Sequence, residues 1–440
     1  MKDRILINEL SSHVGKEVSI AGWVDVRRDQ GKMVFFNFRD RSGSVQGVTL
    51  ATSPALEVAK TLRSEYVVSV TGKVNKRPEK NINVGVPNGD IELEILNIKV
   101  LNEAHEIPFE KNADINIDTR FDHRPFTLRS ERDQDIFKVQ ATIVKAYRDS
   151  LTRQGFLDFQ APALVGGDAE GGAAVFKVNY YYDQTAYLAT SPQLYKQIMV
   201  GAFERAFTIA KIFRAEKSAT TRHLAELTQM DFEMGFIDDE HDVMDALETT
   251  IRDTVNATVT AHHDVFQRFN TEVPRMSETF PRLTLKEALD IVGGSGDDMD
   301  PEHERAICEW SKKEKGSDFV FITKFPTRVR AFYTMSDTET DGLSRGFDLL
   351  FRGLEINSGA QRIHQYDELV ARIKERGLDP EKFTFYLEAF KYGIPPHGGC
   401  STGLERLTAR MLELGNVKEA SAFPRDMNRI DLLLRSDETA

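Results

Sequence analysis

The sequence predicts an α+β protein with an all-β N-terminal part and a larger part that mixes strands and helices. Residues 1–104 contain short runs in which every second residue is apolar, the period of a half-buried strand. Two further alternating runs flank a polar loop within 207–234, and apolar residues repeat at helical spacing within 404–414. The 440 residues are enough for two or three domains and a large core.

The N-terminal part reads as five short strands with one inserted helix. Two strands precede a turn at 41–43, and a third strand, a short helix and two further strands follow it. The apolar side chains of all five strands should face one interior. The expected elements are Val18 to Val26, Val34 to Phe38, 44–50, a helix at 55–63, 66–76 and 91–101. This pattern fits an OB-fold barrel.

Phe35 is out of phase with its apolar neighbours Val34, Phe36 and Phe38, so it should point to the outer face of the barrel. An exposed aromatic ring there is a natural platform for stacking a nucleic-acid base. The alternative is that both faces of this strand are covered.

The segment 207–234 predicts two adjacent antiparallel strands. One face carries the apolar residues Phe207, Ile209, Phe213, Met230, Phe232 and Met234, and the other carries Arg214, Glu216, Gln229, Asp231 and Glu233. A polar face with a fixed cation and carboxylates suits a ligand that has phosphate at one end and amino groups at the other. The alternative is a hairpin whose charged face is merely solvated.

The segment 397–407 reads HGGCSTGLERL and should open an amphipathic helix that stops near Gly415. Its apolar stripe is formed by Leu404, Leu407, Met411 and Leu414. Arg406 falls in the first helical turn, where its charge adds to the partial positive charge of the helix end and suits a phosphate.

Composition favours a cytosolic protein. No apolar run approaches the length of a membrane span, and the start lacks an apolar signal segment. The two cysteines, Cys308 and Cys400, are far apart and lack metal-ligand partners at useful spacing. The net charge of -12 argues against DNA as a partner, but residues 1–104 carry a small positive excess that leaves RNA open.

Three motifs, in the expected order, resemble those of class II aminoacyl-tRNA synthetases. GFLDFQAP at 155–162, after a helix-like run from Phe137 to Gln154, resembles motif 1, whose proline Pro162 would lie at a homodimer interface. FRAE with RHLAE resembles motif 2, and GLERL resembles motif 3.

Within the class, the chain resembles aspartyl-tRNA synthetases of the archaeal type from about Val18 to Asp431. The matching blocks are AEGGA, SPQLYKQ, RGLEINSGAQR, YGIPPHGG and FPRD. The resemblance implies an anticodon-binding OB-fold domain at 1–104, a linker at 105–128, and a catalytic domain at 129–440 built as an antiparallel sheet flanked by helices. A small helical insert near 281–315, with capping-box spacing at Thr284 and Glu287, reads as structural.

The resemblance implies ATP as a substrate, because such an enzyme joins an amino-acid carboxylate to the α-phosphate of ATP before it charges tRNA. Most of the rate acceleration should come from positioning the reactants and from stabilising the charge that develops on the phosphates. Arg214 and Arg406 match the two catalytic arginines. The full set of implied ATP-binding residues is Arg214, Glu216, Arg222, His223, Glu355, Gly403 and Arg406.

The resemblance also implies a site for L-aspartate in which Arg362 and Lys196 hold the side-chain carboxylate and Gln229 and Asp231 accept from the ammonium. Glu170 lies on the loop that would close over the amino acid. The implied set is Glu170, Ser191, Gln193, Lys196, Arg214, Gln229, Asp231, Ser358 and Arg362. Two cations should disfavour asparagine, which would leave a buried charge unpaired.

Two further sets follow from the resemblance. Asp348 and Glu355 match the ligands of Mg2+, which takes one or two carboxylates with phosphate oxygens. The alternative for these acids is a salt-bridged strand pair with Arg345 or Arg352. In the barrel, the implied anticodon residues are Phe35, Gln46, Glu92 and Asp25.

The implied activity is aspartate–tRNA ligation with tRNA(Asp), and whether tRNA(Asn) is also a partner stays open, because Asp25 stands where the family has an aromatic residue or His. Thr190, in place of Gln, and Cys400 to Thr402 also depart from the family pattern. The alternatives are an asparaginyl-tRNA synthetase, which Lys196 disfavours, a tRNA-free asparagine synthetase, which the barrel disfavours, and a non-catalytic RNA-binding paralogue.

Overall fold

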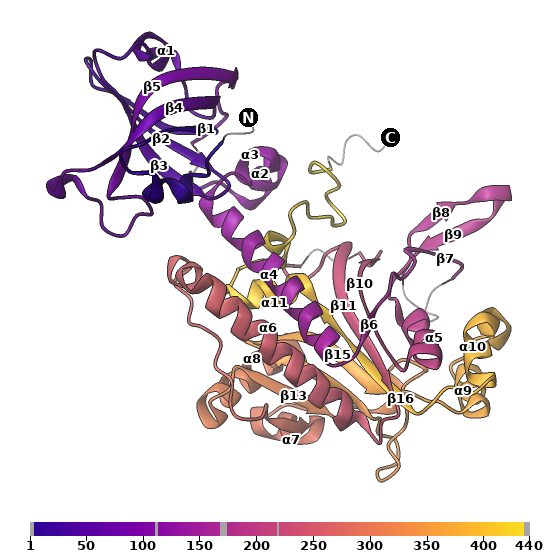
Figure 1. Ribbon diagram of the computed structural model, residues 1–440. Coiled ribbons are helices and arrows are strands. Elements are labelled where there is room, and N and C mark those ends of the chain that lie inside the picture. Colours follow the sequence, from indigo (N-terminus) through magenta and orange to yellow (C-terminus); the bar gives the residue numbers. More distant parts are fainter. Residues whose placement is uncertain (1–3, 111–112, 168–173, 218–219, 435–440) are drawn as a thin grey trace. The chain divides into compact units, whose positions relative to one another are not determined.

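The computed structural model describes residues 4–110, 113–167, 174–217 and 220–434 (Figure 1). The chain divides into two compact units, Met1–Ala113 and Asp114–Ala440. None of the helices in the described ranges is long and apolar enough to cross a membrane. Both cysteines are buried and free.

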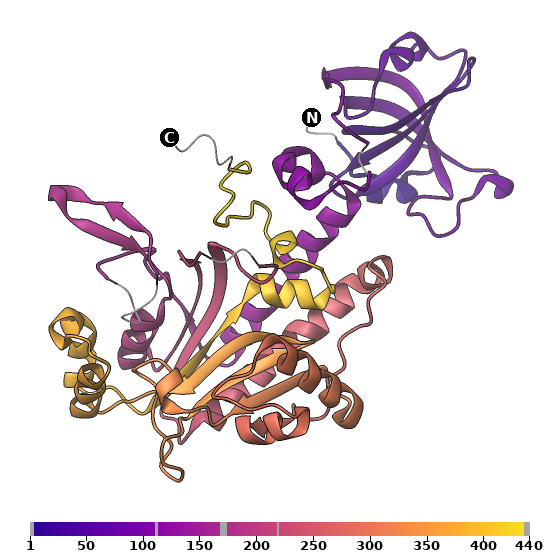
Figure 2. The same cartoon turned by 180° about the vertical axis from the view of Figure 1, so that it is seen from behind.

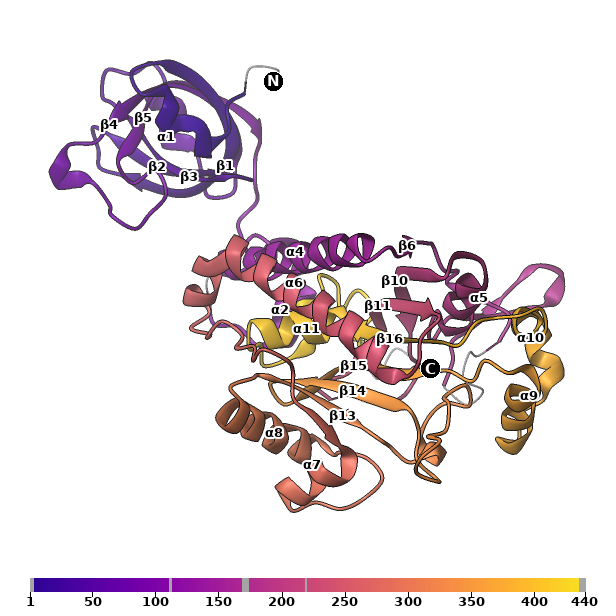
Figure 3. The ribbon, with the colours of Figure 1, turned by 60° about the horizontal axis from the view of Figure 1, so that its bottom comes forward.

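The first unit is a closed five-stranded barrel, seen close to end-on in Figure 3. Around the barrel the order is β1 (Glu17–Asp29), β2 (Val34–Asp40), β3 (Gly43–Thr49), β5 (Ile91–Asn102) and β4 (Val67–Lys76). The inserted helix α1 (Leu56–Thr61) lies between β3 and β4 in sequence. The expected OB-fold barrel is confirmed, with β3 and β5 as its parallel pair.

The side-chain phases of the barrel follow the sequence except at one bulge. Phe36 and Phe38 are buried and stacked with their ring centroids 5.1 Å apart, while Phe35 is half-buried on the opposite face. The expectation that Val26 points inward is wrong. The β1–β2 register shifts between Val24 and Val26, so Val24 is fully buried and Val26 is 39% exposed.

The second unit is built on an eight-stranded sheet (Figures 1 and 2). Its order is β12 (Arg282–Thr284), β13 (Phe319–Thr323), β14 (Gly346–Phe351), β15 (Leu354–Gln361), β16 (His397–Gly403), β11 (Glu226–Gly235), β10 (Arg205–Phe213) and β6 (Leu157–Asp158). The inner strands pair antiparallel, as expected, but the pairs β12–β13 and β10–β6 at the two edges are parallel.

Two long helices lie side by side across one face of this sheet, α4 (Glu131–Arg153) and α6 (Glu240–Arg268) (Figures 1 and 3). Ser150 on α4 donates to Asp253 on α6 at 2.6 Å, and Gln154 donates to Thr250 at 2.8 Å. The helix expected from Phe137 begins earlier, because Ser130 caps it by accepting from the Asp133 N–H.

The other elements surround the sheet. A three-stranded sheet is formed by β7 (Leu164–Val165), β9 (Thr185–Leu188) and β8 (Lys177–Asn179). The remaining helices are α2 (Ile117–Asp122), α3 (Arg124–Thr127), α5 (Gln193–Phe203), α7 (Leu285–Val292), α8 (Pro301–Trp310), α9 (Tyr366–Glu375), α10 (Thr384–Lys391) and α11 (Leu404–Met411). The stretch expected to link two domains contains α2 and α3, and the expected insert contains α7 and α8.

The predicted hairpin is confirmed, since β10 and β11 pair antiparallel with Phe207 opposite Phe232 and Ile209 opposite Met230. The expected helix with Arg406 in its first turn is confirmed, but the Gly-rich segment before it is a strand. Residues 397–403 form β16 between β11 and β15, and α11 begins only at Leu404. Gly399 permits this packing, because a Cβ there would lie 2.1 Å from Glu233 Oε2.

Candidate active site

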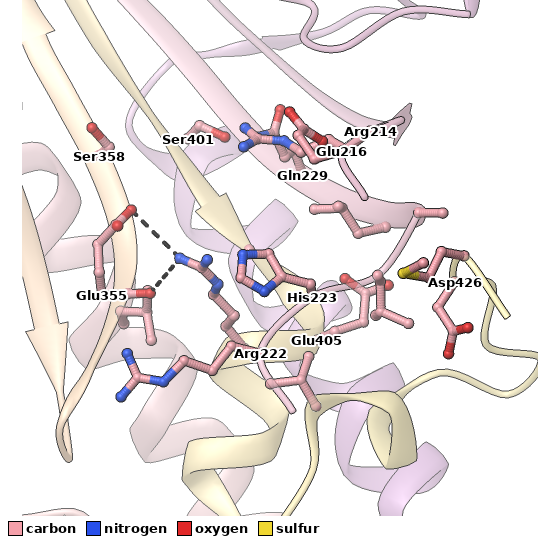
Figure 4. Close-up of a pocket in the computed structure, with 18 residues that line it drawn as sticks. Arg214, Glu216, Arg222, His223, Gln229, Glu355, Ser358, Ser401, Glu405 and Asp426 are labelled. Carbon is pink, nitrogen blue, oxygen red and sulfur yellow. Dashed lines mark hydrogen bonds and ion pairs between the residues drawn. The ribbon is translucent and has the colours of Figure 1, made fainter. Parts of the chain in front are cut away.

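A cavity of about 290 Å³ opens on the sheet face opposite α4 and α6, where strands β11, β15 and β16 meet α11 and the segment that joins β10 to β11 (Figure 4). The residues that line it are Arg214, Glu216, Arg222, His223, Leu224, Ala225, Leu227, Gln229, Glu355, Ile356, Ser358, Ser401, Gly403, Glu405, Arg406, Val417, Asp426 and Met427. Cations and carboxylates face one another across this cavity.

The first wall pairs Arg406 with Glu355. Arg406, in the first turn of α11, donates through Nη1 to the Glu355 carbonyl oxygen at 2.9 Å and lies 3.6 Å from its Oε1. The helix is fixed to the sheet by Glu405, whose two carboxylate oxygens accept from the Thr228 N–H at 2.9 and 3.1 Å. A guanidinium and a helix N-terminus therefore face the cavity together.

The surroundings of Glu355 change the pKa of its side chain strongly. Burial raises the pKa of its carboxyl to about 7, Arg406 opposes the rise, and the neighbouring charge of Asp348 reinforces it. About a third of the side chain still faces the cavity, so a cation entering there would stabilise the ionised form. Burial, followed by the charge of Arg406, lowers the pKa of His223, which is therefore neutral at pH 7.

The opposite wall is formed where the chain leaves β10. The Arg214 N–H donates to the Ala225 carbonyl at 2.9 Å, which closes the base of the polar loop. The exposed side chains of Arg214 and Glu216 reach the cavity beside Gln229 on β11 (Figure 4). Within the described residues, Gln229 Oε1 is buried without a hydrogen-bond partner, so it is available as an acceptor.

Behind the cavity lies a fully enclosed network of two cations and two carboxylates. Lys196 on α5 donates to Asp231 Oδ2 at 3.0 Å and lies 3.4 Å from Glu233 Oε2. Arg362 donates through Nε to Glu233 Oε1 at 2.8 Å. Asp231 also accepts from the Ser401 hydroxyl at 2.7 Å, and Ser401 lines the cavity. The network therefore borders the cavity at the Ser401 hydroxyl.

The charges in this network balance. Burial would raise the pKa of the Glu233 carboxyl, but Arg362 and Lys196 more than offset it and hold that pKa below its ordinary value. The Arg362 guanidinium also donates to the Gly399 carbonyl at 2.8 Å and contacts Gln193 Oε1 at 3.4 Å. Four ionised groups are thus paired and hydrogen-bonded, the condition under which charges are tolerated in an interior.

Uncharged side chains around this network are hydrogen-bonded to one another and hold it in place. Gln197 accepts from Tyr386 Oη at 3.0 Å and from Gln193 Nε2 at 2.9 Å, and its own Nε2 lies 2.8 Å from His397 Nε2. His397 Nδ1 lies 2.9 Å from the Pro395 carbonyl, which fixes the ring as the neutral tautomer with Nε2 accepting. Burial lowers the pKa of His397 to about 4.

The structure brings most of the predicted residues together, but not all in one cavity. Those at the cavity are Arg214, Glu216, Arg222, His223, Gln229, Glu355, Ser358, Gly403 and Arg406. Gln193, Lys196, Asp231 and Arg362 lie in the buried network. Ser191 precedes α5, where its hydroxyl accepts from the Gln193 N–H at 3.2 Å. Glu170 lies outside the described residues.

Asp348 is held by a partner that the sequence did not indicate. Arg330 grips both of its carboxylate oxygens, at 3.0 and 2.7 Å, and also donates to the Ser358 hydroxyl at 3.2 Å. The alternative pairing of Asp348 with Arg345 or Arg352 is wrong, since Arg345 lies near Glu240 and Arg352 pairs with Asp318. Arg330 precedes Asp348 by a long loop, so no short-range spacing signals the contact.

The predicted magnesium ligands fit the ion unequally. Glu355 and Ser358 present oxygens to the cavity, and the raised pKa of Glu355 marks a carboxylate that a cation would stabilise. Asp348 is already neutralised by Arg330. No cluster of three or more acidic, His or Cys side chains suited to a metal occurs within the described ranges. The donor set therefore suits Mg2+ that arrives with phosphate oxygens rather than a protein-only cage.

The barrel carries a separate hollow of about 190 Å³ on its outer face, lined by Phe35, Gln46, Arg28 and Arg77 among others. Arg77 donates to Gln46 Oε1 at 3.1 Å, and Gln46 donates to Glu92 at 3.3 Å. An aromatic ring next to linked polar groups suits a nucleic-acid base.

Asp25 and Pro162 lie away from these cavities. Asp25 does not line the barrel hollow, and Arg39 pairs with it at 3.3 Å while also binding Glu65. Pro162 is exposed between β6 and β7 in the isolated chain.

Comparisons with known proteins agree with this geometry. Residues 116–427 match the family of class II tRNA synthetases (D, K and N), and residues 18–101 match the OB-fold nucleic acid binding domain. The aspartate–tRNA(Asp/Asn) ligase of Thermus thermophilus is 43% identical, with 97% of this chain and 99% of the relative covered. The aspartate–tRNA(Asp) ligase of Pyrococcus horikoshii is 37% identical, with 96% and 98% covered.

Solved structures give the same architecture. The asparaginyl-tRNA synthetase of Pyrococcus horikoshii, complexed with asparaginyl-adenylate, matches with a TM-score of 0.90 at 31% identity over 98% of this chain and all of that one. A putative aspartyl-tRNA synthetase from Leishmania major matches with a TM-score of 0.88 at 29% identity, over 97% of this chain and 94% of that one. The chain belongs to the class II aminoacyl-tRNA synthetases of the aspartate, lysine and asparagine group.

Proposed function

We propose that this chain is an aspartate–tRNA ligase, which activates L-aspartate with ATP to aspartyl-adenylate and transfers the aspartyl group to the 3′ end of tRNA(Asp). The proposal rests on one observation, that two chemically distinct regions lie next to each other. A cavity lined by Arg214 and Arg406 suits a triphosphate, and the enclosed network of Lys196 and Arg362 lies directly behind it.

In the first step a carboxylate of aspartate attacks the α-phosphate and pyrophosphate leaves. Arg214 would stabilise the charge that develops on the α-phosphate, and Arg406 would hold the departing phosphates at the N-terminus of α11. Glu216, which lines the same cavity, would accept from the adenine amino group. His223 lines the same cavity and would donate a hydrogen bond to a phosphate oxygen.

Mg2+ would be held by Glu355 together with phosphate oxygens, and it would supply charge neutralisation at the triphosphate. Ser358 offers a further oxygen at the same wall. Asp348, gripped by Arg330, would act as the second carboxylate behind this set.

The amino acid would bind where the cavity meets the buried network. Gln229 Oε1, buried and without a partner within the described residues, would accept from the ammonium group. The side-chain carboxylate would meet Arg362 and Lys196, which lie behind the part of the cavity wall formed by Ser401. They are already paired with Glu233 and Asp231, so aspartate would join an existing network rather than fill an unpaired cationic pocket.

The hollow on the barrel would take an anticodon base on Phe35, with Gln46 and Glu92 as polar readers. Asp25 would act indirectly, through its ion pair with Arg39. We also propose a homodimer in which the exposed Pro162 lies at the interface. Sedimentation of the purified protein would test this, and a monomer at micromolar concentration would contradict it.

The structural similarity to asparaginyl-tRNA synthetases makes asparagine the second candidate substrate. Pyrophosphate exchange with each amino acid, measured side by side, decides between them. Charging of purified tRNA(Asp) and tRNA(Asn) with labelled aspartate then decides the tRNA range. We expect tRNA(Asp) to be charged; charging of both would define a relaxed ligase, and charging of neither by a protein that catalyses no exchange would leave a non-catalytic paralogue.

A further inference from the structure

The predicted ATP residue Arg222 is fixed by the helical insert that the sequence indicated to be purely structural. Its Nη1 donates to Glu304 Oε2 at 2.6 Å, and its Nη2 donates to the Gly353 carbonyl at 3.2 Å. Glu304 lies on α8, and Gly353 lies in the turn between β14 and β15. One guanidinium thus connects the polar loop, the insert and the turn that leads into Glu355.

The turn is itself packed tightly against α8. Gly353 has φ +76°, and a Cβ there would lie 2.8 Å from Arg305 Cγ and 3.2 Å from Arg305 Cα. The Gly353 N–H also hydrogen-bonds to the buried Cys308 of the same helix. The position of α8 therefore governs the backbone two residues before Glu355, in addition to the position of Arg222.

The Glu304–Arg222 pair is mostly shielded from water, since the side chains are 12% and 19% exposed. Burial raises the pKa of Glu304, while the Arg222 hydrogen bond and charge oppose the rise. A carboxylate in such a position is retained at little cost only while its cation stays in place. Arg222 also lines the cavity, and its hydrogen bonds to Glu304 and Gly353 use two of its five N–H groups, so the others can meet a phosphate.

We propose that Glu304 is a positioning residue for ATP: the insert helix α8 holds Arg222, through Glu304, in the orientation that lets it bind the triphosphate. This inference rests on the proposed ATP site and extends it to an element outside the three motifs. The carboxylate acts through Arg222 and does not touch the substrate.

Two variants separate positioning from simple charge effects. Glu304→Ala removes the acceptor, so Arg222 loses one of its two anchors. Glu304→Gln removes the charge but keeps an oxygen that can accept from Arg222 Nη1. If the carboxylate served only to compete with ATP for Arg222, both variants would bind ATP more tightly. If it served only the stability of the insert, unfolding would change and the KM for ATP would not.

The test is aspartate-dependent pyrophosphate exchange with ATP varied, together with calorimetric titration of Mg·ATP alone. We expect Glu304→Ala to raise the KM for ATP about tenfold, the ratio that corresponds to ~1.4 kcal/mol. The KM for aspartate should be unchanged, and Glu304→Gln should recover most of the loss. Glu309→Gln, an exposed acid on the same helix, is the matched control and should behave as wild type.

In an Arg222→Ala background, Glu304→Ala should have no further effect on the KM for ATP, because the two residues act as one unit. If Glu304→Ala does not fold, Glu304→Asp, which is one methylene too short to reach Arg222, replaces it. An unchanged or lowered KM for ATP in the folded variant overturns the inference. If the wild-type protein binds Mg·ATP but catalyses no aspartate-dependent pyrophosphate exchange, the proposed function is overturned. The calorimetric titration of Mg·ATP would then still test the role of Glu304.

Discussion

Arg330 holds both carboxylate oxygens of Asp348, at 3.0 and 2.7 Å, while its guanidinium carbon lies 3.7 Å from the centre of the Phe325 ring. The pair lies 10–16% exposed at the edge of the proposed nucleotide site. Arg330 thus neutralises the charge of Asp348 from within the chain.

Removing that cation should destabilise the fold. Arg330→Met leaves Asp348 beside other acids without a partner, and breaking a buried pair in this way costs about 3 kcal/mol. Urea unfolding should report the loss, and added Mg2+ should restore part of it in the variant only. Arg328→Met, which removes an exposed pair with Asp297, should stay within about 1 kcal/mol of wild type. Equal effects of the two substitutions would show that Asp348 does not depend on Arg330.

Arg362 should be indispensable for amino-acid activation. Arg362→Leu leaves the fully buried Glu233 with Lys196, 3.4 Å away, as its ion-pair partner within the described residues, and removes the group proposed to meet the substrate carboxylate. We expect aspartate-dependent pyrophosphate exchange to be abolished while circular dichroism shows a folded protein. Arg362→Lys keeps the charge without the planar fork and should be impaired rather than inactive. Wild-type exchange by the leucine variant would refute the assignment.

His397 should make stability fall in mild acid. Its folded pKa of about 4 lies below the value of about 6.5 in an unfolded chain, so the unfolded state binds more protons between those pH values. Stability is therefore complete above pH 6.5 and decreases toward pH 4, by on the order of 3 kcal/mol. Urea unfolding across this range should show the slope.

His397→Asn should flatten that slope, because Asn can accept from Gln197 without titrating. The same slope in the variant would place the titrating group elsewhere. Because Gln197 binds Gln193, which contacts Arg362, the wild-type KM for aspartate should also rise in the acid range.

Phe35 should contribute to tRNA binding and should have no effect on the activation of aspartate by ATP. Phe35→Ala removes the aromatic face of the barrel hollow, and loss of one stacked base costs about 1–3 kcal/mol. The KM for tRNA(Asp) in aminoacylation should rise accordingly, with pyrophosphate exchange unaffected. Val84→Ala, at a position 90% exposed on the same unit, is the control. An unchanged KM for tRNA would remove Phe35 from the anticodon surface.

The sequence predicted those features that residues close together in the chain determine. The two phases of the β10–β11 hairpin and the place of Arg406 in the first turn of α11 could be predicted because neighbours along the chain decide them. The strand at 397–403 could not, since its Gly, Cys, Ser and Thr residues show no apolar alternation and it is specified by the strands on either side.

Ion-pair partners that come from segments distant in the sequence could not be predicted either. Arg330 for Asp348 and Glu304 for Arg222 come from loops and an insert whose positions depend on the assembled sheet. No spacing rule connects such residues, although each is a charged side chain that the folded structure buries with an opposite charge.

The sealed network of Lys196, Asp231, Glu233 and Arg362 has a consequence for how the protein responds to ionic strength. Dissolved ions screen charges in contact with water, but they reach buried pairs poorly. Discrimination between aspartate and asparagine should therefore persist in concentrated salt, whereas contacts with the phosphates of tRNA weaken as counterions return to the RNA. A salt titration thus separates the two kinds of recognition within one polypeptide.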